Sequence, residues 1–194
     1  MRRKLQRLTL LNNSFPILVL ATNSNFFELF SLPVLFQVDL FILEQEYKKL
    51  QAEFHPDRFV EADDRTRLQA LQQTSMVNDA YETLKSPLKR SAYLLKLNDV
   101  DPDEHNQAHM QEEFLLQQLE MRETLESLID KEDMEGLDAM KLTVSKEKGA
   151  ALELFETKFL EADFLAAKSN YHQLQFLFKL LDEIDKAEEK LLDY

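Results

Sequence analysis

The chain has no cysteine, no tryptophan and only two glycines among its 194 residues. The absence of cysteine excludes disulfides, thiolate ligands for iron-sulfur clusters, cysteine-based zinc sites and a cysteine nucleophile. Two glycines are too few for the tight turns of an all-β sandwich or barrel, or for the phosphate-binding loops of Rossmann and P-loop folds. Because 44% of the residues are hydrophobic, the composition is that of a globular protein. A mostly helical fold remains.

Acidic residues outnumber basic ones, with 36 Asp and Glu against 23 Lys and Arg and a formal net charge of −13. Nucleic-acid binding draws on clustered Lys and Arg that neutralise phosphates, so this balance argues against a nucleic-acid partner. The charge is also uneven, because no acidic residue precedes Glu28 while four basic ones do: Arg2, Arg3, Lys4 and Arg7. The N-terminus is therefore a different kind of segment from the rest of the chain.

Residues 1–24 form this basic N-terminal extension. Its apolar stretches are short and are interrupted by Asn12, Asn13 and Ser14, whereas a helix needs about 20 apolar residues to cross a bilayer. The sequence thus predicts no membrane anchor. A basic, acid-free start fits three interpretations: an extension translated ahead of the functional domain, a transit peptide, or a poor secretory signal. Under each of them the extension is dispensable for folding.

Apolar periodicity predicts helices from Asn25 onward. The first is short, covers 26–32 and ends before a proline, which disfavours helix at the residue ahead of it. The next covers 40–55, where apolar residues recur every three or four positions. Asp39 is its expected N-cap, and Pro56 follows its end.

A second long helix follows a charged loop at 58–64. Its apolar stripe is expected to consist of Leu68, Leu71, Met76, Ala80 and Leu84, with Val77 and Tyr81 alongside. Ser86 and Pro87 close this helix, and a shorter one is predicted at 88–97. Two long helices joined by a polar loop are typical of an antiparallel hairpin.

The clearest break in periodicity lies at 98–106, where asparagine, aspartate and proline are concentrated. We place a linker at 98–108 and a second domain at 109–194. Three long helices are predicted there, at 110–130, 133–162 and 163–192, with a candidate interruption of the middle one at Gly149. Long helices with short connections form an antiparallel three-helix bundle.

A His-Pro-Asp tripeptide at residues 55–57 opens the loop of the predicted hairpin and is exposed by its position. Proline removes a backbone donor and fixes its own φ, so the flanking imidazole and carboxylate are held in a stiff turn. Such a turn suits recognition of another protein. A tripeptide of this kind is common in surface turns, so its context decides its meaning.

In this context the chain resembles the J-domain of DnaJ-type co-chaperones over residues 25–97. The resemblance rests on the tripeptide and on three runs, Phe26–Phe30, Tyr47–Leu50 and Asn78–Lys85. Three further runs look like the HscB subfamily, the J-proteins of iron-sulfur cluster assembly: Ser86–Leu95, Phe114–Glu123 and Ala187–Tyr194. The implied fold is all-α, with an N-terminal J-domain (an antiparallel helix hairpin with flanking short helices) and a C-terminal antiparallel three-helix bundle.

The resemblance implies a co-chaperone without an active site, whose J-domain binds a dedicated HscA-type, DnaK-like ATPase and accelerates its ATP hydrolysis. His55, Pro56 and Asp57 match the residues on which this stimulation depends in the family. The expected chaperone-binding positive charge comes from Lys48, Lys49 and Arg58. Glutamates on the same helix dilute that charge (Glu44, Glu46 and Glu53), so the contact is expected to be weaker or restricted to one chaperone.

The helix predicted at 110–130 carries two apolar stripes when it is turned through about 100° per residue. One consists of Phe114, Met121, Leu125 and Leu128. The other, on nearly the opposite side, consists of Leu115, Leu116 and Leu119 with Glu120 and Glu123 among them. A three-helix bundle needs only one stripe. The second is therefore either packed against the J-domain or exposed, and an exposed apolar patch mixed with carboxylates marks a protein-binding site.

In the HscB family the positions matching this second stripe bind the iron-sulfur scaffold protein IscU, so the resemblance favours exposure. The scaffold-binding residues it implies are Leu115, Leu116, Leu119, Glu120, Glu123 and, on the last helix, Phe176. Ser127 stands where the family often has an acid. The remaining phenylalanines of the bundle are expected to be core residues: Phe155, Phe159, Phe164 and Phe178.

Two other functions compete with this interpretation. The first is a J-protein that serves the general DnaK chaperone or delivers a different client. The sequence does little to distinguish it from a co-chaperone dedicated to iron-sulfur cluster assembly. An enzyme would use His55 and Asp57 for acid-base chemistry, but no glycine-rich loop, nucleophile motif or facing carboxylate pair accompanies them. We therefore predict no enzymatic activity.

No cofactor is predicted, and no metal site. His105, His109 and His172 show no metal-ligand spacing with a carboxylate partner, so they are expected to be ordinary surface or edge residues. The expected compartment is the bacterial cytoplasm, with the mitochondrial matrix as the alternative if residues 1–24 are a transit peptide.

Overall fold

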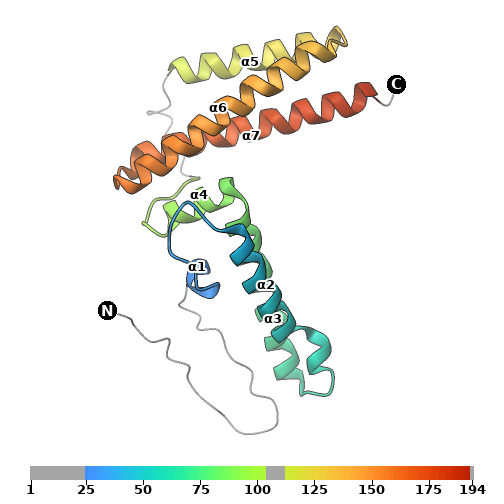
Figure 1. Ribbon diagram of the computed structural model, residues 1–194, viewed down its shortest axis with the longest axis vertical. Coiled ribbons are helices and arrows are strands. Elements are labelled where there is room, and N and C mark those ends of the chain that lie inside the picture. The colour runs from blue at the N-terminus through green and yellow to red at the C-terminus, as the bar shows by residue number, and fades with distance from the viewer. Residues whose placement is uncertain (1–24, 104–111, 193–194) are drawn as a thin grey trace. The chain divides into compact units, whose positions relative to one another are not determined.

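The computed structural model of the chain describes residues 25–103 and 112–192 (Figure 1). These residues contain seven α-helices and one 3-10 helix, and no strand occurs among them. The chain divides into two compact units between Ser86 and Pro87, and each unit is described by itself. The all-α fold class predicted from the sequence is confirmed.

An antiparallel helical hairpin forms the first unit, made of α2 (Leu40–Phe54) and α3 (Asp64–Lys85) (Figure 1). The Asp39 carboxylate accepts hydrogen bonds from the N–H groups of Phe41 and Ile42, which caps α2 as the sequence predicts. The short α1 (Phe26–Leu29) packs against α3. The core is built from aromatic and aliphatic side chains: Phe27, Phe30, Leu43, Phe54, Val77 and Leu84.

The buried face of α3 differs from the expected stripe. Its buried residues follow alternating spacings of three and four: Ala70, Gln73, Val77, Ala80 and Leu84. Leu68 and Leu71 are instead 56% and 53% exposed, so their assignment to the apolar stripe that packs inward was wrong. The reason is geometric, because a helix buries the residues that share a face, and these two leucines lie on the opposite side from Gln73.

Four helices form the second unit: α4 (Pro87–Lys96), α5 (Glu112–Asp130), α6 (Met134–Leu160) and α7 (Phe164–Leu192). α6 and α7 pack along their length, α5 lies against both, and α4 packs against α7 (Figure 1). The predicted three-helix bundle is confirmed. α6 passes through Gly149 without interruption. None of the described helices has the length and apolar character that a membrane span requires.

The division between the units lies earlier than the predicted linker. α4 falls with the second unit, whereas the sequence placed residues 88–97 in the first domain. Most of the predicted linker, from residue 104 onward, lies outside the described residues, as does the extension at 1–24. The boundary at 98–108 stays a prediction.

The helices end without glycine. Both glycines lie inside α6, yet left-handed backbone conformations follow α1, α4, α5 and α6 at Ser31, Asp99, Glu132 and Ala162, with φ between 53° and 59°. In each case the next N–H bonds to a carbonyl five residues back, as in Asp133 to Leu128 at 3.0 Å and Asp163 to Lys158 at 3.0 Å. These are Schellman motifs, which satisfy the terminal carbonyls. Connections that normally require glycine are therefore made by other residues.

Candidate functional site: an exposed turn and an exposed helix face

The His-Pro-Asp tripeptide lies where α2 ends. Phe54, the last residue of α2, is buried, while His55 turns the chain outward with φ −57° and ψ 128° into the 3-10 helix η1 (Pro56–Phe59). The side chains of His55 and Asp57 are 52% and 86% exposed. His55 Nδ1 accepts a hydrogen bond from the Asp57 N–H at 3.3 Å. The proton of the neutral ring therefore resides on Nε2, which can donate to a partner.

Both ends of the turn are attached to the hairpin. The hydroxyl of Thr74 on α3 lies 2.9 Å from the carbonyl oxygens of Phe54 and Ala70. The Arg58 guanidinium donates back to the carbonyls of Ala52 and Glu53, at 3.2 and 3.4 Å, and so satisfies acceptors in the last turn of α2. Arg58 thus has a structural task in addition to its predicted role in chaperone binding, which stays a prediction.

The basic side chains of α2 are paired with acidic neighbours. Lys48 lies 2.6 Å from Glu44, and Lys49 lies 2.5 Å from Glu46. The hydrogen bond and charge of Glu44 raise the pKa of Lys48. These exposed pairs contribute little to stability, and the three glutamates of α2 outnumber its two lysines. The dilution of charge expected from the sequence is thus present as specific ion pairs.

A polar and aromatic network holds α2 against α3. The rings of Tyr47 and Tyr81 stack with centroids 4.0 Å apart, and the Tyr47 hydroxyl donates to Asn78 Oδ1 at 3.0 Å. Gln51 in turn donates to the Tyr47 hydroxyl at 3.0 Å. Several residues that carried the J-domain resemblance therefore serve to fix the hairpin that presents the turn.

A second candidate surface is the outer face of α5. Leu115, Leu116 and Leu119 are 48%, 55% and 53% exposed, and Glu120 and Glu123 are also exposed. The opposite stripe packs inward, since Leu125 is buried while Phe114, Met121 and Leu128 are half-buried. Within its own unit, the second stripe of α5 is therefore the exposed one.

Phe176 is not part of this exposed face. Its side chain is 8% exposed, its ring meets that of Phe114 edge to face at 6.2 Å, and the Arg122 guanidinium lies 5.9 Å from its centroid. Ser127 on α5 is half-buried. Phe176 therefore supports α5 from beneath, and its role in scaffold binding stays a prediction.

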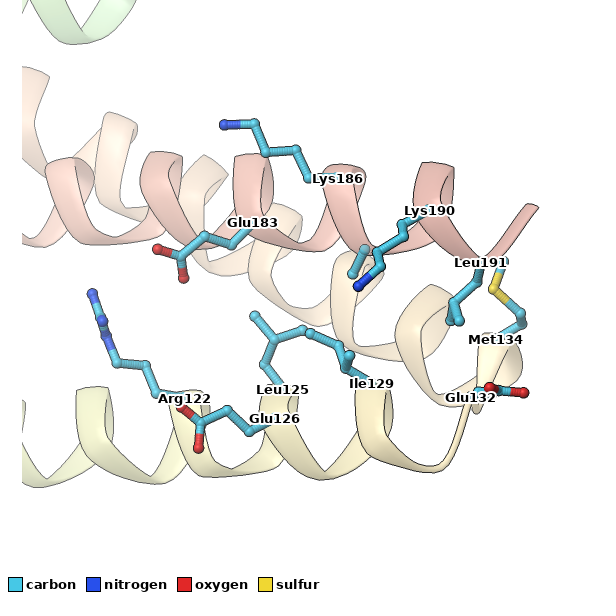
Figure 2. Close-up of a pocket in the computed structure, with 11 residues that line it drawn as sticks. Arg122, Leu125, Glu126, Ile129, Glu132, Met134, Glu183, Lys186, Lys190 and Leu191 are labelled. Atoms are coloured by element: carbon cyan, nitrogen blue, oxygen red, sulfur yellow. The ribbon is translucent and has the colours of Figure 1, made fainter. Parts of the chain in front are cut away.

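An open cleft that the sequence analysis did not predict lies between α5 and α7, with a volume of about 780 Å³ (Figure 2). Apolar side chains line it, including Leu125, Ile129 and Leu191, and charges of both signs surround them. The only available signal was the four-residue spacing of Leu125 and Ile129. The charged side chains that line the cleft are Arg122, Glu126, Glu132, Glu183, Lys186 and Lys190.

Neither of the two described histidines, His55 and His172, belongs to a metal centre. His172 Nε2 lies 2.9 Å from the carbonyl oxygen of Pro102 and is half-buried. His105 and His109 lie outside the described residues. Within residues 25–103 and 112–192 no three potential metal-ligating side chains come together.

Comparison with known proteins gives a consistent result. A family model described as the HSCB C-terminal oligomerisation domain matches residues 110–185. A co-chaperone protein HscB homolog from Vibrio cholerae is 38% identical over 169 residues, which cover 87% of this chain and 99% of that protein. The chain belongs to the HscB co-chaperone family. A second HscB homolog, from Psychromonas ingrahamii, is 36% identical over the same length.

Solved HscB structures share the fold. Chaperone HscB from Vibrio cholerae superposes with a TM-score of 0.79 at 37% identity, covering 87% of this chain and 99% of that one. Human co-chaperone protein HscB gives a TM-score of 0.81 at 26% identity, covering 87% and 84%. The Jac1 co-chaperone from Saccharomyces cerevisiae, at 23% identity and a TM-score of 0.65, shows the same fold. The described fold is thus shared with solved HscB structures over 87% of this chain.

Proposed function

We propose that this HscB-family protein is a co-chaperone in the maturation of iron-sulfur cluster proteins. It stimulates ATP hydrolysis by an HscA-type, DnaK-like chaperone through His55, Pro56 and Asp57, and it delivers the IscU scaffold through the outer face of α5. The observation that carries the proposal is the exposed His-Pro-Asp turn, which Thr74 and Arg58 brace at the end of the α2–α3 hairpin.

The turn is suited to act on another protein. A partner that receives His55 and Asp57 meets side chains whose backbone is already fixed, so little conformational entropy is lost on binding. His55 supplies a donor at Nε2, and Asp57 supplies a carboxylate acceptor. The chain performs no covalent chemistry in this scheme, because the ATPase hydrolyses the nucleotide and the turn only favours its active conformation.

The outer face of α5 has the composition of a protein-binding patch. Three half-exposed leucines offer apolar area, while Glu120 and Glu123 restrict the partner to one with complementary positive charge. Because one chain carries both surfaces, it raises the effective concentration of the scaffold at the ATPase. The relatives at 36–38% identity are bacterial proteins, which favours the bacterial cytoplasm as the compartment.

Steady-state ATP hydrolysis by a purified HscA-type chaperone tests the proposal. This protein and the IscU scaffold are added separately and then together, and their combined stimulation is expected to exceed the product of the separate effects. His55→Gln is expected to abolish stimulation and to keep scaffold binding. Leu116→Ala combined with Leu119→Ala is expected to do the reverse.

Two results would contradict the proposal. Stimulation that is indifferent to the scaffold would leave a J-protein with another client, such as a partner of the general DnaK chaperone. Loss of both activities in either variant, with an unchanged circular dichroism spectrum, would refute the division of labour between the turn and α5.

A further inference from the structure

Two exposed leucines on α3 have no task in the fold or in the function proposed above. Leu68 and Leu71 are 56% and 53% exposed, and they are three residues apart, which places them on one side of the helix. Val60, the residue after η1, is 64% exposed. We call these three residues the α3 flank. Isolated surface leucines are ordinary, so the location of this group decides its significance.

The α3 flank lies beside the His-Pro-Asp turn. Thr74 is the residue of α3 from which the distance to the turn can be judged. Its hydroxyl contacts the carbonyl of Phe54, the residue directly before the tripeptide. Leu71 and Leu68 lie about 4.5 Å and about 9 Å along the helix axis from Thr74, toward the start of α3. They also lie about 60° and about 120° round the helix from it, on the side away from the buried Gln73.

An interface centred on the turn is large enough to reach this flank. A specific protein interface covers about 800 Å² on each partner, which is roughly a disc of 16 Å radius. The tripeptide supplies only a fraction of that area. η1 packs against α3 (Figure 1), so a partner that covers His55 and Asp57 reaches the first turns of α3 as well.

The other side of the turn offers little affinity. Lys48 and Lys49 on α2 are already paired with Glu44 and Glu46, and exposed ion pairs that must be rearranged contribute weakly to binding. Apolar area removed from water contributes in proportion to its size, and the α3 flank offers such area beside the turn.

We propose that Val60, Leu68 and Leu71 form an apolar contact with the same DnaK-like ATPase that receives the His-Pro-Asp turn. The contact holds the ATPase and takes no part in stimulating it. It requires the ATPase to present apolar side chains next to the site that receives His55 and Asp57. This inference rests on the function proposed above, and the experiment below separates the two.

The test uses the full chain with Leu68→Gln and Leu71→Gln together. Glutamine keeps helix propensity and length, and both sites are exposed, so folding is expected to be unchanged. The concentration that gives half-maximal stimulation of the ATPase is expected to rise about tenfold, with the same maximal rate at saturation. Leu142→Gln and Leu165→Gln are the matched controls, at leucines that are 74% and 79% exposed, and they are expected to behave like the wild type.

Each outcome has one meaning. An unchanged half-maximal concentration would overturn the α3 flank while the function proposed above stands, and so would a lower maximal rate at saturation. A wild-type protein that stimulates no HscA-type or DnaK-type ATPase would overturn the proposed function itself. Sedimentation of the wild type as a dimer that dissociates in the double variant would show that the flank binds a second copy, which also overturns the inference.

Discussion

A single hydroxyl joins the His-Pro-Asp turn to the rest of the hairpin. Thr74 Oγ1 lies 2.9 Å from the Phe54 carbonyl, an acceptor that the end of α2 leaves without a helical partner. Replacing Thr74 by valine keeps the shape and the β-branch and removes only the hydroxyl. The free energy of unfolding is expected to fall by about 1 kcal/mol, measured by urea denaturation.

The same variant is expected to stimulate the ATPase less, because the turn then loses one of the bonds that hold it and depends on Arg58 and on the burial of Phe59. Thr74→Ser is the control, since it keeps the hydroxyl and is expected to retain more stability and stimulation than valine. Equal stability of the valine variant and the wild type would show that this bond does not hold the turn.

At the scale of single elements, α6 has a glycine at a position that suits alanine, and an alanine just after its end at a position that suits glycine. Gly149 lies inside the helix, and a Cβ added there meets nothing within 4 Å. Ala162, just after the helix, has a φ of 57°, which glycine adopts without cost. Gly149→Ala and Ala162→Gly are therefore each expected to raise the free energy of unfolding by about 1 kcal/mol. Urea denaturation followed by circular dichroism measures both.

Gly136 provides the opposite case in the same helix. A Cβ there would lie 2.7 Å from Asp133 Oδ2 and would also collide with Leu128, so Gly136→Ala is expected to destabilise the bundle. The Asp133 carboxylate accepts from the Gly136 N–H at 2.9 Å and caps α6, so the clash falls on the cap itself. Equal effects of alanine at positions 136 and 149 would contradict this account.

The helices were predictable from local signals, whereas their buried faces were less so. The two ends of α2 were predictable from Asp39 and Pro56, because capping and proline geometry act within a few residues. Leu68 and Leu71 were assigned to the apolar stripe of α3 by residue type, although counting back from Leu84 in steps of four and three leads to Gln73 and Ala70. That count was the available signal.

The candidate site also has features that local signals predicted and features that they did not. The exposure of the tripeptide followed from its place in a loop, and the exposure of Leu116 and Leu119 followed from two stripes on one helix. The burial of Phe176 had a signal too, because Phe176, Leu180 and Ile184 are spaced by four residues on α7 and all three are buried. The identity of its aromatic neighbour, Phe114 on α5, depends on how the helices pack and could not be found from either helix alone.

At the scale of the whole molecule, the function requires both surfaces on one chain. The turn lies in the unit that ends at Ser86, and the face of α5 lies in the unit that begins at Pro87. Each unit has its own core, so a change on one surface is expected to leave the fold of the other unit intact. A variant defective only in the turn and a variant defective only in the face of α5 can thus be made as two separate proteins.

This separation gives a test of tethering. Protein carrying His55→Gln is mixed with protein carrying Leu116→Ala and Leu119→Ala, so that each surface is present but never both on one chain. The mixture is expected to lose the excess stimulation produced by the wild type with scaffold, because the effective concentration supplied by covalent linkage is lost. The control is an equal mixture of wild type and either variant, which retains it. Full synergy in the mixture of variants would show that the two surfaces act independently, and that joining them in one chain contributes nothing to delivery.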